Sequence, residues 1–185
     1  HAFDKAKLGD KIVVRRAKDN ETTTTLDDIE RKLNHHDIVI TDTTNDSEDT
    51  RIVCVAGVMG CSNTEVTETT KTVVLESAVF RPLSVRRTSS KLGLRSESSV
   101  RFERGVDLNR TQAALDYACY LLTKYADGKV LSGTVTKGTT YIESRPFRLN
   151  EKYVKDYLGI KITLKEIDSI MKRLSFESEI KDKEV

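Results

Sequence analysis

Glu76 is the residue whose type and surroundings point most directly to chemistry. It is the only acid in the mostly apolar run VVLESAVF, residues 73–80. Alternate side chains of a β-strand share one face. The residues expected on the face of Glu76 are all apolar: Val74, Ala78 and Phe80. An unpaired buried charge is costly, so two interpretations stay open: an ion pair with Arg86 or Arg101, or a hydrogen-bond acceptor at the floor of a pocket.

The turn AGVMGCSN, residues 56–63, is a second candidate for contact with a ligand. Gly57 and Gly60 permit positive φ and a close approach of a ligand to backbone N–H groups. An ordinary turn between two strands accounts for the same residues, so both interpretations stay open. Cys61 follows directly, but a thiol nucleophile needs a positioned base, and the sequence indicates none.

The segment LGLRSESSVRFERGVD, residues 92–107, is dense in charge. Its charged residues are Arg95, Glu97, Arg101, Glu103, Arg104 and Asp107. Such a segment can be an ion-pair network exposed to solvent, or its serines and arginines can hold a phosphate and a ribose. Composition does not choose between the two. The chain contains no Ser-His-Asp, Walker or dinucleotide-binding pattern.

Strands and helices must bring these candidates together. Runs rich in β-branched residues predict strands at residues 11–17, 36–42, 52–55, 70–80 and 129–143. Pro82 and Gly93 predict the start and the end of a helix over 81–93. An apolar face at helical spacing predicts a helix over 108–127, with Gly128 as its C-terminal cap. We therefore expect an α+β domain with mixed or antiparallel sheets, on which the second helix packs.

The sequence pattern changes near Arg145-Pro146, where we place a domain boundary. Residues 1–144 form the α+β domain, and residues 145–185 form a second, partial module. In this module we predict a helix, a turn at Gly159, a second helix and a strand. Thr163 followed by Glu166 is typical of a capping box at the start of the second helix.

Composition narrows the classes of function. The chain has 185 residues and a formal net charge of +2, so any contact with RNA must come from local arginines and lysines. No apolar run approaches the ~20 residues of a membrane span, and no signal peptide is recognisable. Three cysteines without a CxxC spacing disfavour disulfides and zinc and fit a cytoplasmic location. Because the first residue is not Met, we expect a piece of a longer protein.

Taken together, these motifs resemble a known family. HAFD, VVRRAKDNE, AGVMG and LESAVFRPLSVRRTSSKLGLRSESSVRFERGVD are similar to the editing domain of the bacterial phenylalanyl-tRNA synthetase beta subunit, in the same order. The resemblance runs from residue 1 to about residue 135 and is most specific over 75–107. The tail from about residue 145 resembles the start of the helical, winged-helix-like module that follows in this subunit.

The resemblance implies post-transfer editing, the hydrolysis of tyrosine wrongly esterified to the tRNA for phenylalanine. A hydrophobic pocket for Phe rejects an analogue with an added hydroxyl by only about 10². A second site that hydrogen-bonds this hydroxyl accepts Tyr and refuses Phe, because Phe leaves buried polar groups unpaired. The alternative is a non-catalytic structural or tRNA-binding domain of the same subunit. An ion-paired Glu76 or a pocket closed by Ser98 favours that alternative.

The resemblance also implies roles for five residues. Glu76 corresponds to the glutamate that binds the tyrosine hydroxyl, and Gly60 to a glycine that lines the amino-acid pocket. Ser96 and Ser98 take pocket-lining positions where the family commonly has Thr and Ala. His1 corresponds to a histidine near the scissile ester. No catalytic base or nucleophile is assigned among them.

We expect a bound water to attack the ester carbonyl, oriented by backbone groups of the turn at residues 57–61 and by the terminal ribose hydroxyl. Cys61 stands where the family usually has a second glycine, which argues against a nucleophilic role. No cofactor or metal is expected in this chain, whereas ATP and Mg²⁺ serve the whole enzyme. The expected partners are the tRNA for phenylalanine and the alpha subunit, in a heterotetramer of two alpha and two beta subunits, with no membrane.

Overall fold

The computed structural model describes residues 1–43, 50–138, 143 and 145–185. Contacts between Cα atoms divide the chain into two compact units, residues 1–142 and 143–185. The domain boundary that we placed after residue 144 lies two residues beyond this division. The described strands and the first three α-helices belong to the first unit.

The first unit is built on a four-stranded sheet in the order β2-β5-β6-β7. Its strands are β2 (Lys11–Arg16), β5 (Ile38–Thr43), β6 (Arg51–Val55) and β7 (Met59–Gly60). Two smaller sheets accompany it: β1 (Ala2–Asp4) with β8 (Val73–Leu75), and β3 (Thr22–Thr24) with β4 (Glu30–Lys32). Every pairing between these strands is antiparallel. The α+β class that we predicted is therefore confirmed.

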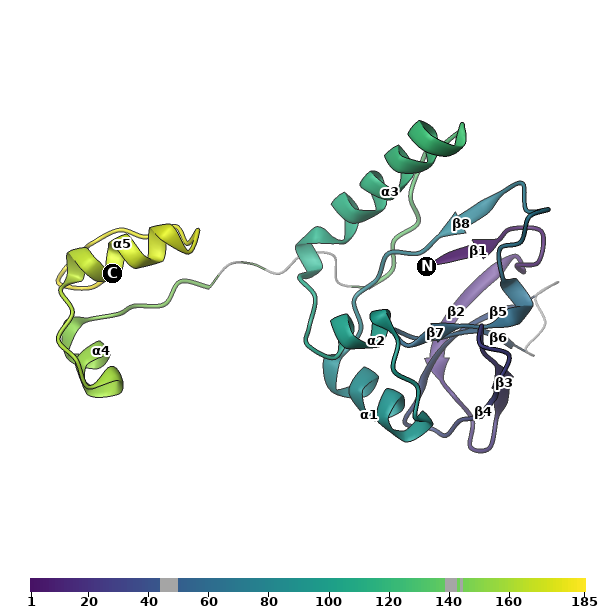
Figure 1. The fold of residues 1–185 in the computed structure, drawn as a ribbon, viewed down its shortest axis with the longest axis horizontal. Coiled ribbons are helices and arrows are strands. Elements are labelled where there is room, and N and C mark those ends of the chain that lie inside the picture. Colours follow the sequence, from purple (N-terminus) through teal and green to yellow (C-terminus); the bar gives the residue numbers. More distant parts are fainter. Residues whose placement is uncertain (44–49, 139–142, 144) are drawn as a thin grey trace. The chain divides into compact units, whose positions relative to one another are not determined.

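The first half of β5 and most of β6 are apolar on both faces because both faces of the sheet are covered. Val39 and Ile40 are neighbours in β5 but belong to two different core clusters. The cluster of Val39 includes Val85 from α1 (Pro82–Leu92), whereas the cluster of Ile40 includes Phe3 from β1. Figure 1 shows α1 on one side of the sheet and the β1–β8 pair on the other. The sheet is therefore the middle layer of this unit.

Local signals set the ends of the helices next to the sheet. Helix α1 has Pro82 in its first turn and ends at Gly93, whose φ of 60° is left-handed, as predicted. The short helix α2 (Glu97–Phe102) was not predicted, although it begins with a capping box. The Ser96 hydroxyl accepts a hydrogen bond from the Ser99 amide at 3.0 Å. The charged segment of residues 92–107 is therefore partly helical.

Helix α3 (Thr111–Ala126) forms where we predicted it, preceded by the 3₁₀ turn η2 (Leu108–Arg110). It contains no fully buried residue, and its apolar side chains Leu115, Leu121 and Leu122 are half-buried. Both faces of the sheet are already covered by other elements. Asp127, rather than Gly128, adopts the left-handed conformation that ends the helix, with φ 49°.

Three predicted strands are shorter than expected or absent. The strand predicted over 70–80 is confined to residues 73–75. Residues 129–138 form no strand, and residues 139–142 lie outside the described part of the chain. In the second unit, the segment that we expected as a strand after the last helix contains only an isolated bridge between Lys181 and Glu184.

The second unit contains α4 (Glu151–Leu158) and α5 (Leu164–Arg173). Gly159 ends α4 with φ 76°, and Thr163 and Glu166 form the predicted capping box of α5. The assignment of the second unit as the start of a winged-helix-like module stays a prediction. Within the described residues of the chain, no helix has the length and apolar character needed to cross a membrane.

Candidate substrate-binding cavity

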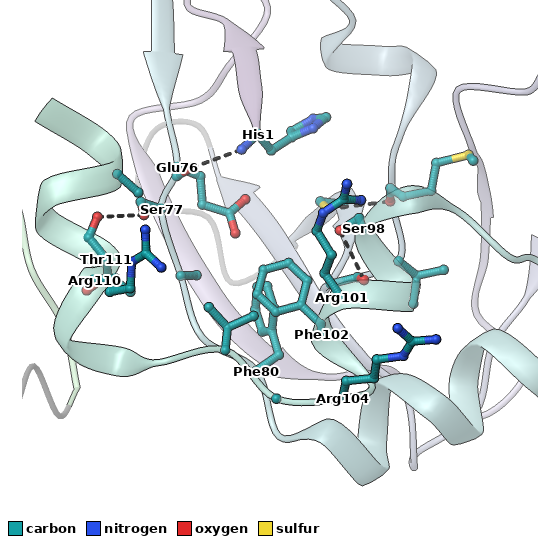
Figure 2. A pocket seen from close by; sticks show the side chains of 18 of the residues that line it. His1, Glu76, Ser77, Phe80, Ser98, Arg101, Phe102, Arg104, Arg110 and Thr111 are labelled. Carbon is teal, nitrogen blue, oxygen red and sulfur yellow. Dashed lines mark hydrogen bonds between the residues drawn. The ribbon is translucent and has the colours of Figure 1, made fainter. Parts of the chain in front are cut away.

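A cavity of about 720 Å³ lies within the first unit. Four segments form its wall: His1, the end of β6 with the β6–β7 turn, the chain after β8, and the stretch from α2 through η2 to the first turn of α3. Phe80 and Phe102 make an apolar side, with ring centroids 5.0 Å apart in an edge-to-face arrangement. Figure 2 shows the side chains around this space. Such a volume is typical of small-molecule sites.

Glu76 points into the cavity from the end of β8 (Figure 2). Its backbone N–H donates to the His1 carbonyl at 2.8 Å, which continues the β1–β8 ladder and fixes the residue. Its Oε2 atom is buried and has no hydrogen-bond partner among the described residues. Ala78 and Phe80 line the cavity with it, as their expected shared face suggested. Val74 packs against the core instead.

Glu76 also lacks the ion pair that a structural role requires. Arg101 pairs with Glu97 at 2.6 Å, and Glu76 forms no salt bridge with any residue in the described ranges. Burial raises the pKa of Glu76 above its ordinary value. A hydroxyl donor from a ligand would satisfy the free oxygen.

Gly57 and Gly60 both have neighbours in the space that a side chain would take. At Gly57 the backbone φ is 71°, and a Cβ atom would lie 2.8 Å from the Phe80 ring. A Cβ atom at Gly60 would lie 2.3 Å from Cε1 of His1. Both glycines and His1 line the cavity, and the imidazole occupies the space above Gly60. Gly60 therefore makes room for the histidine ring.

Of the two serines expected to line the pocket, Ser96 and Ser98, only one does so. Ser98 lines the cavity, and its hydroxyl donates to the Gly57 carbonyl at 3.2 Å. Ser96 does not line the cavity, contrary to expectation, because its hydroxyl caps α2 and donates to the Val58 carbonyl at 2.5 Å. The serines therefore attach α2 to the glycine turn, and the carbonyls of Gly57 and Val58 are already engaged. The cavity remains open despite the extra hydroxyl of Ser98.

The cysteines near the cavity are unsuited to nucleophilic attack. Cys61 is buried, its Sγ accepts a hydrogen bond from the Thr23 hydroxyl at 3.1 Å, and burial raises its pKa to about 11. Cys54 lines the cavity, but burial and the nearby Glu76 charge raise its pKa well above the ordinary value. Both thiols are therefore protonated at neutral pH, when nucleophilic chemistry needs a thiolate.

For the arginines of residues 92–107, sequence analysis left open a role in holding a phosphate and a ribose, but it did not single out Arg110 or specify the wall of the cavity. Arg101, Arg104 and Arg110 all line it. The charge density of residues 92–107 was a signal for the first two, but it did not show which way the side chains point. Among the described residues, no group of three or more His, Cys, Asp or Glu side chains could hold a metal ion.

Comparison with known proteins agrees with the sequence motifs. A family model described as the B3/4 domain matches residues 1–127. The phenylalanine–tRNA ligase beta subunit of Bacillus subtilis (strain 168) is 46% identical over 177 residues, which cover 95% of this chain and 21% of that protein. The same subunit of Staphylococcus haemolyticus is 45% identical over 182 residues, 98% of this chain and 22% of its own length.

The Staphylococcus aureus (strain Mu50) subunit is 42% identical over 183 residues, 98% of this chain and 22% of that protein. The chain thus spans about a fifth of the length of the relatives it matches. The family model covers more than half of the chain, and the relatives align along most of it. The chain therefore belongs to the B3/4 domain family of phenylalanine–tRNA ligase beta subunits.

Proposed function

We propose that the cavity hydrolyses tyrosine that has been wrongly esterified to the tRNA for phenylalanine. The observation that carries this proposal is the buried, unpartnered Oε2 atom of Glu76 in the wall of a largely apolar cavity. A phenolic hydroxyl donates one hydrogen bond, and the rest of a tyrosine side chain is apolar. The cavity therefore suits tyrosine in both respects.

Selectivity against phenylalanine follows from the same atom. Phenylalanine in the cavity would exclude water from Glu76 without replacing its hydrogen bond, which leaves a buried acceptor unsatisfied. Correctly charged tRNA would thus be spared. The absence of an ion pair to Glu76 among the described residues and the open cavity favour editing over the non-catalytic alternative.

In this proposal a water molecule attacks the ester carbonyl. The acyl–oxygen bond breaks, tyrosine leaves as the acid, and the terminal ribose of the tRNA regains its hydroxyl. Glu76 holds the phenol, the glycine turn shapes the space near the ester, and the His1 imidazole lies over Gly60 in the same wall. Positioning supplies most of the rate. The neutral thiols of Cys54 and Cys61 take no part.

The partners in this proposal are those of the whole ligase. They are the tRNA for phenylalanine and an alpha subunit, in an assembly of two alpha and two beta subunits. ATP and Mg²⁺ serve aminoacylation, which the proposal places in the alpha subunit. The editing reaction itself requires neither.

Hydrolysis of tyrosyl-tRNA by the full ligase tests the role of Glu76. A charge-assisted hydrogen bond is worth roughly 1.5–3 kcal/mol, and each 1.4 kcal/mol is about tenfold in rate. Glu76→Ala should therefore slow deacylation by about one to two orders of magnitude. Glu76→Gln should lose less, because it keeps the shape and an acceptor oxygen.

Two controls accompany this test. Glu68→Ala removes an exposed carboxylate that does not line the cavity, so it should edit like wild type. Aminoacylation with phenylalanine should stay nearly unchanged in every variant. Wild-type rates of tyrosyl-tRNA hydrolysis in Glu76→Ala would leave Glu76 with a structural role and favour the non-catalytic alternative.

A further inference from the structure

Three arginines in the cavity wall are not explained by binding of an amino acid. Arg101 and Arg104 lie at the end of α2 and just beyond it, and Arg110 ends η2. Figure 2 shows them around the cavity, with Arg110 on the opposite side from Arg101 and Arg104. The turn that joins the two groups includes Gly105, whose φ is 91°.

These guanidinium groups are mostly free of acidic partners. Arg104 and Arg110 form no salt bridge or side-chain hydrogen bond with the part of the chain that the structure describes. The first turn of α3, directly after Arg110, contains no acid. Asp107 also lines the cavity, but its Oδ1 accepts from the Asn109 amide at 3.0 Å and caps η2. The excess positive charge is therefore available to a ligand.

Arg101 is available as well. Its Nη1 atom donates to the Glu97 carboxylate at 2.6 Å and to the Glu97 carbonyl at 2.9 Å. Both partners of this ion pair are exposed, with side-chain exposures of 66% and 88%. Exposed pairs of this kind contribute little to stability. A stronger anion can therefore replace Glu97 without a large cost.

The charges of the cavity are separated: Glu76 has a buried carboxylate oxygen, whereas the three arginines are exposed, as is Asp107, which caps η2. A ligand that fits both must carry a hydroxyl donor at its inner end and anions at its outer end. Building on the proposed function, we infer that Arg101, Arg104 and Arg110 bind the backbone phosphates next to the terminal nucleotide of the charged tRNA. Arginine matches phosphate geometry with paired N–H donors. Phosphate contacts of this kind position an RNA rather than read its sequence.

Two tyrosyl esters separate this inference from the proposed function. One is tyrosyl-tRNA, and the other is 3′-O-tyrosyl-adenosine, which has the ester and the terminal nucleoside but no phosphate. The double variant Arg104→Ala/Arg110→Ala of the full ligase should hydrolyse tyrosyl-tRNA about tenfold more slowly at moderate salt. It should hydrolyse tyrosyl-adenosine at the wild-type rate. Glu76→Ala should slow both reactions.

Salt dependence supplies the readout that a structural role would not move. When phosphates are contacted, log(kcat/KM) falls as log salt rises. Each lost phosphate contact should make this fall shallower by about 0.7 for a single-stranded end. Arg87→Ala is the matched control, because Arg87 is exposed on α1 and does not line the cavity. It should change neither the rates nor the slope.

Three outcomes would overturn the inference. They are an unchanged slope in the double variant, a slope change equal to that of Arg87→Ala, and an equal loss of rate on both esters. If the wild type hydrolyses neither ester, the proposed function fails on its own. The arginines are then judged by the salt slope of Kd for uncharged tRNA, where an unchanged slope in the double variant overturns the inference.

Discussion

The first unit buries carboxylates in two contrasting ways, at the ends of β5 and in the cavity. Asp37 lies just before β5, and its carboxylate accepts hydrogen bonds from the Thr88 hydroxyl at 2.8 Å, the Asn34 amide and Lys91. Asp42, near the other end, accepts from Arg51 and from the Gly9 amide at 2.7 Å. Glu76 has a buried oxygen with no such partner among the described residues.

The pKa values follow the same contrast. Burial alone would raise the pKa of Asp42, but hydrogen bonds from Arg51 and Gly9 outweigh it and leave the pKa below its ordinary value. Burial raises the pKa of Glu76, and no hydrogen bond from the described residues to its buried Oε2 atom offsets this rise. Carboxylates whose two oxygens both accept hydrogen bonds, such as those of Asp37 and Asp42, connect elements of the fold to one another. A carboxylate without such partners weakens the fold, and its free oxygen can accept a hydrogen bond from a ligand.

We expect the largest loss of stability when a carboxylate with hydrogen bonds to both oxygens is removed. Asp37→Ala should lower the free energy of unfolding by about 3 kcal/mol, because Lys91 and the buried hydroxyl of Thr88 lose their partner. Urea unfolding measures this change. Glu97→Ala, which breaks an exposed pair, should stay within about 0.5 kcal/mol of wild type. Equal losses of unfolding free energy in both variants would contradict the distinction between the buried carboxylate and the exposed ion pair.

Removing the charge of Glu76 should act in the opposite direction. Glu76→Gln keeps the shape of the side chain and replaces a poorly solvated charge by a neutral amide. We expect the free energy of unfolding at pH 7 to rise by about 1 kcal/mol. Urea unfolding of wild type and variant in parallel provides the measurement. Destabilisation by Glu76→Gln would show that the carboxylate contributes to the fold.

The dependence of stability on pH should separate the two carboxylates further. Because the folded pKa of Glu76 is raised, wild-type stability falls as pH rises from the unfolded value of about 4.3 through the folded pKa. The advantage of Glu76→Gln should thus grow above about pH 4 and vanish below it. Unfolding of both proteins between pH 3 and pH 8 tests this, and an advantage that does not vary with pH would refute it.

The contribution of Asp42 to stability should depend on pH in the opposite direction. Its folded pKa is lowered, so it stabilises the fold above the unfolded value of about 3.9, and this contribution is lost as pH falls through the folded pKa. The deficit of Asp42→Asn relative to wild type should therefore shrink in acid. The same set of unfolding curves measures it, with wild type as the reference at each pH.

The smallest effect is expected at Ser98. Its hydroxyl donates one long hydrogen bond, 3.2 Å, to the Gly57 carbonyl. Ser98→Ala should lower stability by about 0.5 kcal/mol and leave the rate of tyrosyl-tRNA hydrolysis within about twofold of wild type. A tenfold rise in this rate would show that the hydroxyl obstructs the cavity.

Local patterns predicted the elements of this chain better than their packing. The apolar runs of β5 and β6 and the Pro82 and Gly93 signals of α1 gave correct elements, because these signals lie within the elements themselves. Helix α3 was also predicted, but what covers a helix depends on segments far away in sequence. The short helix α2 lacks a long apolar pattern and was missed.

The cavity shows the same limit. Glu76 was identified as a buried acid with two possible roles, and only its surroundings distinguish them. Ser96 was placed in the wall because it belongs to the right segment, but its hydroxyl caps α2 and faces the glycine turn. Arg110 joins the wall through the turn at Gly105, which no local pattern specifies.

The hydrogen bond from the Ser77 hydroxyl to the Thr111 carbonyl, 2.8 Å long, has a consequence for the cavity wall (Figure 2). It joins the residue after Glu76 to the first residue of α3, a helix whose apolar side chains are at most half-buried. The bond therefore joins two segments of the cavity wall, the one that carries Glu76 and the one that begins α3.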